Sequence, residues 1–362
     1  MNIIINQQKL QTAVRSVERI VSKNISLPIL NTILLQTDKG KLKLTTTNLE
    51  IGIRYWIGAK IEKEGVLALP ARVFSEFINS VQDEKVALVA EKNTLIITSE
   101  HYKTQILGMV PDEFPIIPTL HNAVEFSVHS SVLKTALASV LESTSLLETR
   151  PELTGVYVHT GASEITFAAT DSFRLSECVL KAPIGVSKAF IVPRTTAQEI
   201  MRLAGDHNED IRIAVSENQI SARGADFELV SRLIDGRYPD YKKIIPEKFN
   251  ATVLIAKDEF ERSIRMASIF SSSISDVILK TTNNTLQLMA KNSDRGEISA
   301  TMTIAGGKTP FEVSVNYRYL LDGLKSIPTN TVLIGYTGQG SPLVLKGENR
   351  DDFVYVIMPL RT

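Results

Sequence analysis

Three stretches of the chain share one order of apolar and polar positions. Each begins with a short extended apolar pattern and continues with apolar residues spaced by four and then three. These stretches are residues 3–21, 126–144 and 254–270. The residues that align within them are Leu10, Leu133 and Phe260, then Val14, Leu137 and Ile264, then Val17, Val140 and Ala267. Such spacing is typical of the buried stripe of an amphipathic helix, so the pattern predicts a strand followed by a helix three times.

The match between the three copies continues downstream. An alternating strand pattern leads each time to a polar turn residue, which is Asn48, Asp171 or Asn292. A third block predicts a short strand and a second helix, at residues 73–81, 196–203 and 317–324. The repeat predicts three α+β domains of one architecture, at residues 1–120, 121–248 and 249–362. We expect two helices and about eight short strands in each, mostly antiparallel because the connections are short.

Composition excludes several classes of protein. Forty basic and forty acidic residues give a formal net charge of zero over 362 residues, which argues against a strongly basic nucleic-acid binder but allows a local basic face. The single cysteine, Cys178, permits no internal disulfide and fits a reducing compartment. We find no leader pattern at residues 1–6 and no apolar run long enough to span a bilayer. The expectation is a cytoplasmic protein without a membrane partner.

The chain offers little catalytic chemistry. Its five histidines are scattered without the spacing of a metal site, and we predict no metal or cofactor. The Gly-Gly-Lys-Thr run at 306–309 lacks the upstream glycine of a phosphate-binding loop and is read as a turn. An enzyme with Asp171 and Arg174 as a polar pair between repeated domains is the catalytic alternative. No nucleophile, base or metal cluster supports it.

Cations occupy the polar face of the first predicted helix. Arg15 and Arg19 lie opposite its apolar stripe, with Lys23 just beyond. A cationic stripe is usually a solvated face, but Arg194 and Arg265 occur on other predicted helices. If these helices line one surface, that surface can hold phosphates without reading sequence.

The C-terminal residues 355–362 are unusually apolar for a chain end, which is ordinarily frayed and polar. One interpretation is a last strand that completes a sheet. The other is one wall of a groove that receives short peptides from other proteins.

Several short motifs together resemble one family. They are Ala-Thr-Asp-Ser-Phe-Arg-Leu at 169–175, the run at 233–241 that ends in Tyr-Pro-Asp-Tyr, Leu-Pro-Ile-Leu at 27–30, Val-Pro-Arg at 192–194 and Met-Pro-Leu-Arg at 358–361. In this order over the whole chain they resemble the bacterial β sliding clamps, processivity subunits of the replicative DNA polymerase. The resemblance implies a head-to-tail homodimer closed into a ring around duplex DNA, with no catalytic activity. Its implied partners are the replicative polymerase, the clamp loader and other proteins with a clamp-binding peptide. A protein-binding scaffold that does not encircle DNA is the other alternative.

The resemblance also implies site residues. The peptide groove corresponds to Leu153, Thr170, Ser172, Phe173, Arg174, Leu175, Pro239, Ile244, Asn316, Tyr319, Val356, Met358, Pro359, Leu360 and Arg361. The cations expected to face DNA are Arg15, Lys23, Arg194 and Arg265. Ile106, Ile269 and Phe270 are the candidates for the dimer interface.

Three positions depart from the family pattern. Phe173 stands where histidine is common, which predicts a more apolar groove. Asn24 replaces a frequent basic residue and leaves Lys23 as the nearby cation, while Pro342 stands where a small polar groove residue is expected.

Overall fold

The structure, a computed structural model, describes residues 1–21, 26–182, 185–205, 208–282, 284–307 and 309–360. Within these ranges the helices lie where the repeat predicts them. They are α1 (Gln7–Glu18), α2 (Ala71–Ser80), α3 (Ser130–Leu141), α4 (Arg194–Gly205), α5 (Lys257–Ser268) and α6 (Tyr317–Ser326). Single turns of 3-10 helix form at η1 (Pro28–Asn31), η2 (Pro111–Glu113), η3 (Pro151–Leu153) and η4 (Tyr241–Ile244).

All nine apolar positions that align between the three repeats are buried. The three on α1 and the three on α5 are fully buried, and those on α3 are at most 4% exposed. The amphipathic prediction is therefore confirmed. The predicted helix ends are less accurate, because α1 ends at Glu18 and the predicted residue Val21 lies outside it.

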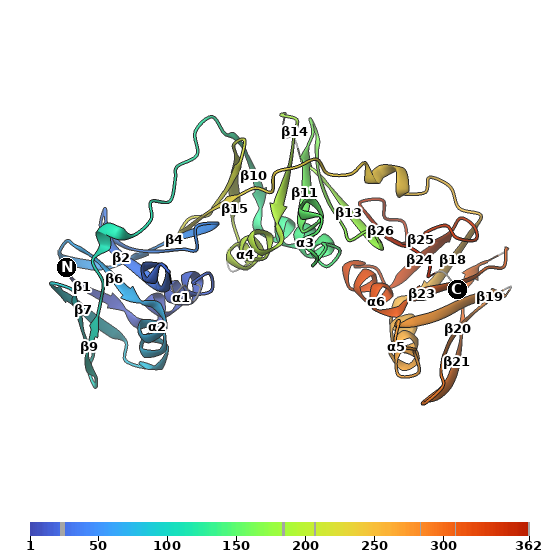
Figure 1. Cartoon of the computed structure of the whole chain (residues 1–362), viewed down its shortest axis with the longest axis horizontal. Helices are drawn as coiled ribbons and strands as arrows, with labels where there is room; N and C mark the ends of the chain where they lie inside the picture. Colours follow the sequence, from blue (N-terminus) through green and yellow to red (C-terminus); the bar gives the residue numbers. More distant parts are fainter. Residues whose placement is uncertain (22–25, 183–184, 206–207, 283, 308, 361–362) are drawn as a thin grey trace. The chain divides into compact units, whose positions relative to one another are not determined.

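The strands form antiparallel sheets in two compact units, one of Met1–Ser131 with Arg202–Leu233 and one of Val132–Met201 with Ile234–Thr362. In the first unit a five-stranded sheet has the order β5 (Lys60–Lys63), β1 (Asn2–Asn6), β7 (Lys85–Glu91), β8 (Thr94–Thr98), β9 (Lys103–Leu107). The other has the order β10 (Val124–His129), β15 (Asp210–Val215), β16 (Gln219–Arg223), β17 (Phe227–Arg232), β4 (Ile51–Gly58), β3 (Lys41–Thr47), β2 (Thr32–Asp38), β6 (Val66–Pro70). Helix α1 packs against α2 and against β3 and β4 (Figure 1).

The second unit repeats this plan. Its larger sheet has the order β14 (Lys188–Pro193), β11 (Gly155–Thr160), β12 (Glu164–Thr170), β13 (Arg174–Lys181), β26 (Phe353–Ile357), β25 (Leu343–Gly347), β24 (Thr331–Tyr336), β18 (Ala251–Ala256), β22 (Ala305–Gly306). Its smaller sheet has the order β21 (Gly296–Thr303), β20 (Thr285–Asn292), β19 (Asp276–Thr282), β23 (Glu312–Asn316). Helix α5 packs against α6, β20 and β21.

Two sheets cross the limits of the sequence repeats. Strand β4 of the first repeat pairs with β17 of the second, and β13 of the second pairs with β26 of the third. The resemblance places the peptide groove at the second of these pairings, because β13 follows the 170–174 turn and β26 precedes the C-terminal segment. The pairing of β13 with β26 joins two segments far apart in sequence into one sheet.

Candidate functional site

The turn between β12 and β13 is held by its own polar side chains. The Asp171 Oδ1 atom accepts hydrogen bonds from the backbone N–H groups of Phe173 and Arg174, both at 2.9 Å. The Thr170 hydroxyl donates to the Arg174 carbonyl at 2.7 Å and accepts from the Ser172 N–H at 3.1 Å. These bonds leave Phe173 at the tip of the turn, 60% exposed.

The segment that follows β26 is fastened to this turn. The Met358 N–H donates to the Phe173 carbonyl at 2.8 Å, and the Leu360 N–H donates to the Ser314 carbonyl of β23 at 2.8 Å. Met358, Pro359 and Leu360 are all half-buried. Two backbone hydrogen bonds thus hold a partly apolar strip beside an exposed phenylalanine, while the predicted residue Arg361 lies outside the described residues.

Arg174 is the charged residue at this place. Its Nε lies 3.0 Å from Asp171 Oδ2, and its Nη1 lies 2.6 Å from Asp322 Oδ2 on α6. Its guanidinium carbon lies 4.6 Å from the centre of the Tyr319 ring. Burial alone would lower the pKa of Arg174, but its polar neighbours Tyr355, Asp322 and Asp171 raise it, so the guanidinium stays protonated.

Three of the predicted groove residues are core residues. Leu153, Leu175 and Val356 are at most 2% exposed and belong to one buried cluster with Tyr238 and Tyr241. They belong to the core on which the candidate site rests and have almost no surface to offer a ligand. Thr170 is also buried, and its N–H donates to the Tyr238 hydroxyl at 3.0 Å.

The other predicted groove residues have mixed surroundings. Ile244, on the short helix η4, is 45% exposed, and Pro239 is half-buried. Asn316 caps α6, because its Oδ1 accepts the Arg318 N–H at 2.9 Å. Pro342 is half-buried just before β25.

The cations predicted to face DNA are not equivalent. Arg15 is exposed on α1, and its Nε donates to Asn79 Oδ1 at 2.9 Å. Arg265 is exposed on α5 and pairs with Glu261 one turn earlier. Arg194 is half-buried and donates to the Leu141 carbonyl at the end of α3 at 2.7 Å, so much of its hydrogen-bonding capacity is used internally. Lys23 lies outside the described residues.

The residues predicted for the dimer interface differ in their exposure. Ile106 is 4% exposed and belongs to the core, which corrects its choice as an interface residue because little of its surface remains to be buried. Its neighbour Leu107 is 76% exposed on β9, an edge strand. Ile269 is 59% exposed, and Phe270 is half-buried.

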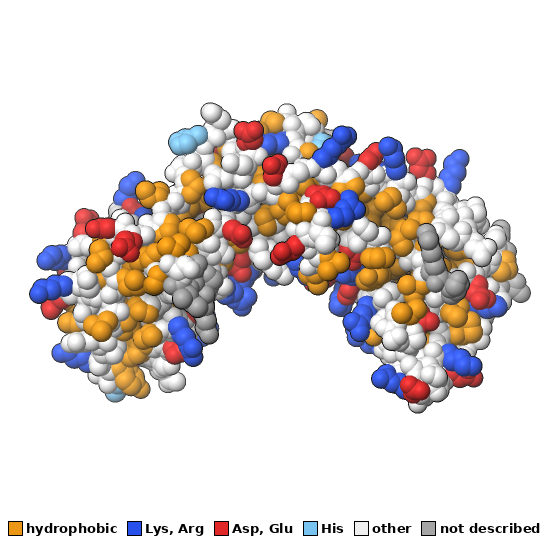
Figure 2. Space-filling model, in the orientation of Figure 1, with side chains coloured by type: hydrophobic (Ala, Val, Ile, Leu, Met, Phe, Trp, Pro, Cys, Tyr) orange, Lys and Arg blue, Asp and Glu red, His pale blue; other side chains and the backbone are white. Residues whose placement is uncertain are grey.

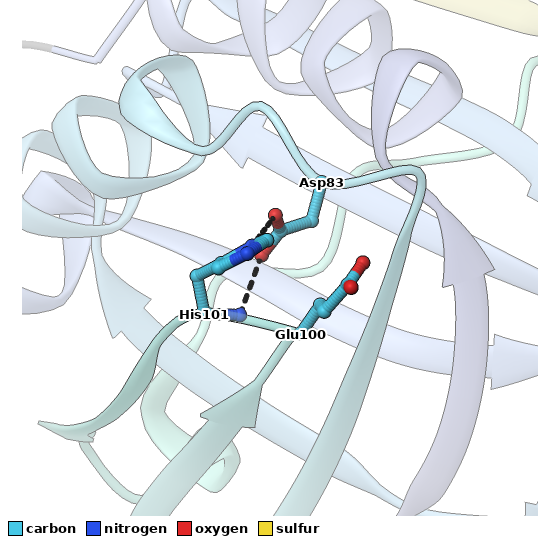
Figure 3. Close-up of side chains that lie close together, drawn as sticks. All are labelled: Asp83, Glu100 and His101. Atoms are coloured by element: carbon cyan, nitrogen blue, oxygen red, sulfur yellow. Dashed lines mark hydrogen bonds and ion pairs between the residues drawn. The ribbon is translucent and has the colours of Figure 1, made fainter.

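One cluster of titratable groups was missed by the search for histidine spacing. Asp83, Glu100 and His101 each place a potential ligand atom within 4.8 Å of the others (Figure 3). Asp83 precedes β7, and the other two lie between β8 and β9, so only the sheet brings them together. His101 Nδ1 lies 2.7 Å from Asp83 Oδ1, and the His101 N–H donates to Asp83 Oδ2 at 3.1 Å. Asp83 and His101 already bond to each other, and exposed acidic groups often cluster without a metal, so we assign no metal here.

Charges of both signs are interspersed over the face in Figure 2, in agreement with the zero formal net charge. None of the helices in the described ranges combines the length and the apolar character that crossing a membrane requires.

Three family models match the chain in the order of its repeats. They are the DNA polymerase III beta subunit N-terminal domain at residues 1–118, the central domain at 127–240 and the C-terminal domain at 242–361. The beta sliding clamp of Synechocystis sp. is 27% identical over 394 residues, covering 100% of this chain and 99% of the relative. That of Staphylococcus aureus (strain Mu50) is 28% identical over 379 residues, covering 100% of both.

Solved structures of sliding clamps have the same fold. The clamp from Bacillus subtilis superposes with a TM-score of 0.94 at 26% identity, covering 100% of this chain and 99% of that one. The clamp from Bartonella birtlesii bound to griselimycin gives 0.95 at 25% identity, covering both chains fully. Because the family models match almost the whole chain in the order of its three repeats, the chain belongs to the DNA polymerase III beta subunit family, the bacterial β sliding clamps.

Proposed function

We propose that this protein is a non-catalytic processivity factor that closes with a second copy into a ring around duplex DNA and slides without reading sequence. It tethers the replicative polymerase, the clamp loader and other proteins through a peptide-binding groove, and it works in the cytoplasm. Membership of the β sliding clamp family supports this function. The alternatives, an enzyme or a scaffold that does not encircle DNA, gain no support from these matches. The domain limits near residues 120 and 248 remain a prediction.

The hydrogen bond between the Met358 N–H and the Phe173 carbonyl carries the proposal for the peptide site. It places the C-terminal strip against the 170–174 turn, so that partly exposed apolar groups lie beside fixed polar ones. The apolar residues with surface to offer there are Phe173, Met358, Pro359 and Leu360, and the family resemblance adds Ile244 on η4. Apolar side chains of a peptide gain by burial against such a surface, while fixed polar groups orient its backbone.

A fluorescence titration tests this site. The probe is a labelled peptide of the Gln-Leu-x-Leu-Phe type, added to wild-type protein and to Met358→Ala. We expect saturable binding that weakens about tenfold in the variant, since losing a buried side chain costs roughly 1.5–3 kcal/mol. Met266→Ala is the matched control, because Met266 is 56% exposed on α5 and should leave the affinity unchanged. Absence of binding by folded wild-type protein contradicts the proposed site.

Retention on circular DNA tests encirclement. We expect protein loaded onto nicked circular duplex by its clamp loader to resist high salt and to be released when the circle is linearised. A protein held only by phosphate contacts would leave both forms equally as salt rises. Arg15→Ala and Arg265→Ala should weaken low-salt binding to short duplex by a few-fold each. Arg350→Ala is the control, because Arg350 lies between β25 and β26 and not on a helix predicted to face DNA.

Edge strands support the proposed dimer. Strand β9 ends one side of the five-stranded sheet, and β21 and β23 are the two edges of the four-stranded sheet. An edge strand presents unpaired backbone groups that a second chain can extend. Analytical ultracentrifugation should show a dimer for wild type and monomers for Leu107→Asp with Ile269→Asp. A wild-type monomer at micromolar concentration contradicts the proposal.

A further inference from the structure

Four polar side chains connect α1 with α2 in one series of hydrogen bonds. The Arg15 Nε atom on α1 donates to Asn79 Oδ1 on α2 at 2.9 Å. The Nδ2 atom of Asn79 donates to the Ser75 hydroxyl oxygen at 3.2 Å, and that hydroxyl donates to the Glu18 carboxylate, back on α1. Every donor in the series points toward the carboxylate, so each bond polarises the next. The two helices pack together (Figure 1), and the series ties the position of Arg15 to Glu18.

Glu18 stands where a helix by itself disfavours a carboxylate. It is the last residue of α1, and the unpaired carbonyl groups there give the helix dipole its negative end. Glu18 is half-buried, and burial raises its pKa, while the positive charges of three arginines oppose that rise. These are Arg15, Arg19 and Arg202. The carboxylate is therefore stabilised by the Ser75 hydroxyl and by the three cations, and not by α1 itself.

The same three arginines carry the positive charge of this surface. Arg15 and Arg19 are exposed, while Arg202 on α4 is half-buried and donates to the Ser16 carbonyl of α1 at 2.5 Å. One carboxylate among three guanidinium groups reduces the local charge from three positive units to two. A phosphate that approaches these cations is repelled by Glu18 at the same time, because salt screens charges only over about 10 Å.

We propose that Glu18 is a built-in counter-charge of the surface predicted to face DNA, where it weakens the hold of the three arginines on duplex phosphates. Through Ser75 and Asn79 it also keeps Arg15 in place. The inference rests on the proposed function of this protein as a sliding clamp. A ring that encircles DNA stays on it without strong contacts, and each phosphate contact that has to break slows its movement. Glu18 thus lowers the affinity of the surface and favours sliding.

Binding to a short labelled duplex at low salt tests the inference. Glu18→Gln removes the charge and keeps an oxygen that accepts the Ser75 hydroxyl. We expect its affinity to rise by about threefold to tenfold, the scale of one partly screened charge contact. Ser75→Ala removes the hydroxyl and keeps the charge, so its affinity should not rise. Glu164→Gln is the matched control, because it changes the net charge equally but lies exposed at the start of β12, and its affinity should equal that of wild type.

A double variant measures the coupling between Glu18 and Arg15. Arg15→Ala should weaken duplex binding more in the Glu18→Gln protein than in the wild-type protein, because an arginine without its counter-charge contributes more to phosphate binding. An equal effect of Arg15→Ala in both proteins would show that Glu18 does not act on Arg15, and would overturn the inference.

Two further results would overturn it. One is unchanged or weaker binding by Glu18→Gln. The other is an equal gain in affinity by Ser75→Ala, which would assign the gain to a looser contact between α1 and α2 and not to charge. In either case wild-type protein still binds duplex, and the proposed sliding function stands. If wild-type protein does not bind duplex at low salt, the predicted DNA-facing surface fails and the inference fails with it.

Discussion

Leu49 and Ser172 occupy equivalent positions in the first and second repeats, and both have a backbone φ of +77°. The hydrogen bonds around them are also equivalent. The Thr47 hydroxyl donates to the Ile51 carbonyl and accepts the Leu49 N–H, as the Thr170 hydroxyl does in its own turn. The 170–174 turn is therefore a structural element of the repeat, and the proposed peptide site is built on it.

The polar residue of each turn should contribute to stability. Asn48 Oδ1 accepts the backbone N–H groups of Glu50 and Ile51 at 3.0 and 2.8 Å. We expect Asn48→Ala to lower the free energy of unfolding by about 1–2 kcal/mol, since two backbone donors lose their acceptor. Asp171→Ala should cost more, because Arg174 also loses a carboxylate. Urea unfolding measures both, and Asp171→Asn is the control that retains Oδ1. Equal stability of Asn48→Ala and wild type would contradict this role.

The positive φ at Leu49 predicts a substitution that raises the free energy of unfolding. Leu49→Gly should raise the free energy of unfolding by up to about 1 kcal/mol, because relief of left-handed strain exceeds the extra entropy of the unfolded chain. Leu49→Val should lower it, since a β-branched residue tolerates positive φ poorly. Leu27→Gly is the control: Leu27 is similarly exposed but has a φ of −129°, so glycine should destabilise there. Thermal unfolding of the three variants decides between strain and simple loss of a side chain.

The sequence predicts the helices of this fold better than its sheets. Apolar steps of four and three depend on neighbours within one helix, so they can be read locally, and all nine aligned positions are buried. The pairing of β4 with β17 and of β13 with β26 joins separate repeats. Local periodicity contains no information on which distant edge a strand will meet.

The sequence predicted which residues belong to the candidate site, but it did not predict which of them are buried. Val356 is 1% exposed because β26 has neighbours on both sides and a continuous apolar pattern, which is typical of a strand covered on both faces. Ile106 and Leu107 are adjacent apolar residues, and alternation sends one into the core and the other to the surface. Asp322 could not be selected from the sequence, since its contact with Arg174 forms only when α6 packs beside β26.

The Asp83–His101 pair predicts a pH dependence. Hydrogen bonds from Ser99 and His101 lower the pKa of Asp83 to about 2, and the bond with Asp83 raises the pKa of His101. The ionised Asp83 carboxylate therefore stabilises the fold above the ordinary pKa of aspartate, and this stabilisation is lost as pH falls toward about 2. The protonated His101 ring contributes stabilisation that is fully present below the ordinary pKa of histidine and is lost as pH rises through the raised pKa of His101.

An NMR titration of the His101 ring measures this coupling. In Asp83→Asn the pKa of His101 should fall toward its ordinary value, because the hydrogen bond to a charged acceptor is lost. Glu100→Gln should lower it less, since Glu100 acts on His101 only through its charge. A pKa of His101 that is the same in wild type and Asp83→Asn would show that the pair does not form in solution.

Gly323 on α6 should be the better residue at its position, although glycine is a poor helix former. A Cβ atom at this position would lie 2.6 Å from Cδ1 of the buried Tyr355 ring. Alanine is the better helix former by about 1 kcal/mol, but overpacking a core costs about 1–3 kcal/mol, so we expect Gly323→Ala to destabilise by up to about 2 kcal/mol. Gly58→Ala is the matched control, because a Cβ at Gly58 meets nothing within 4 Å. Since Gly323 follows Asp322, any shift of α6 should also weaken peptide binding. A Gly323→Ala protein with wild-type stability and affinity would show that the Tyr355 ring moves aside at no cost.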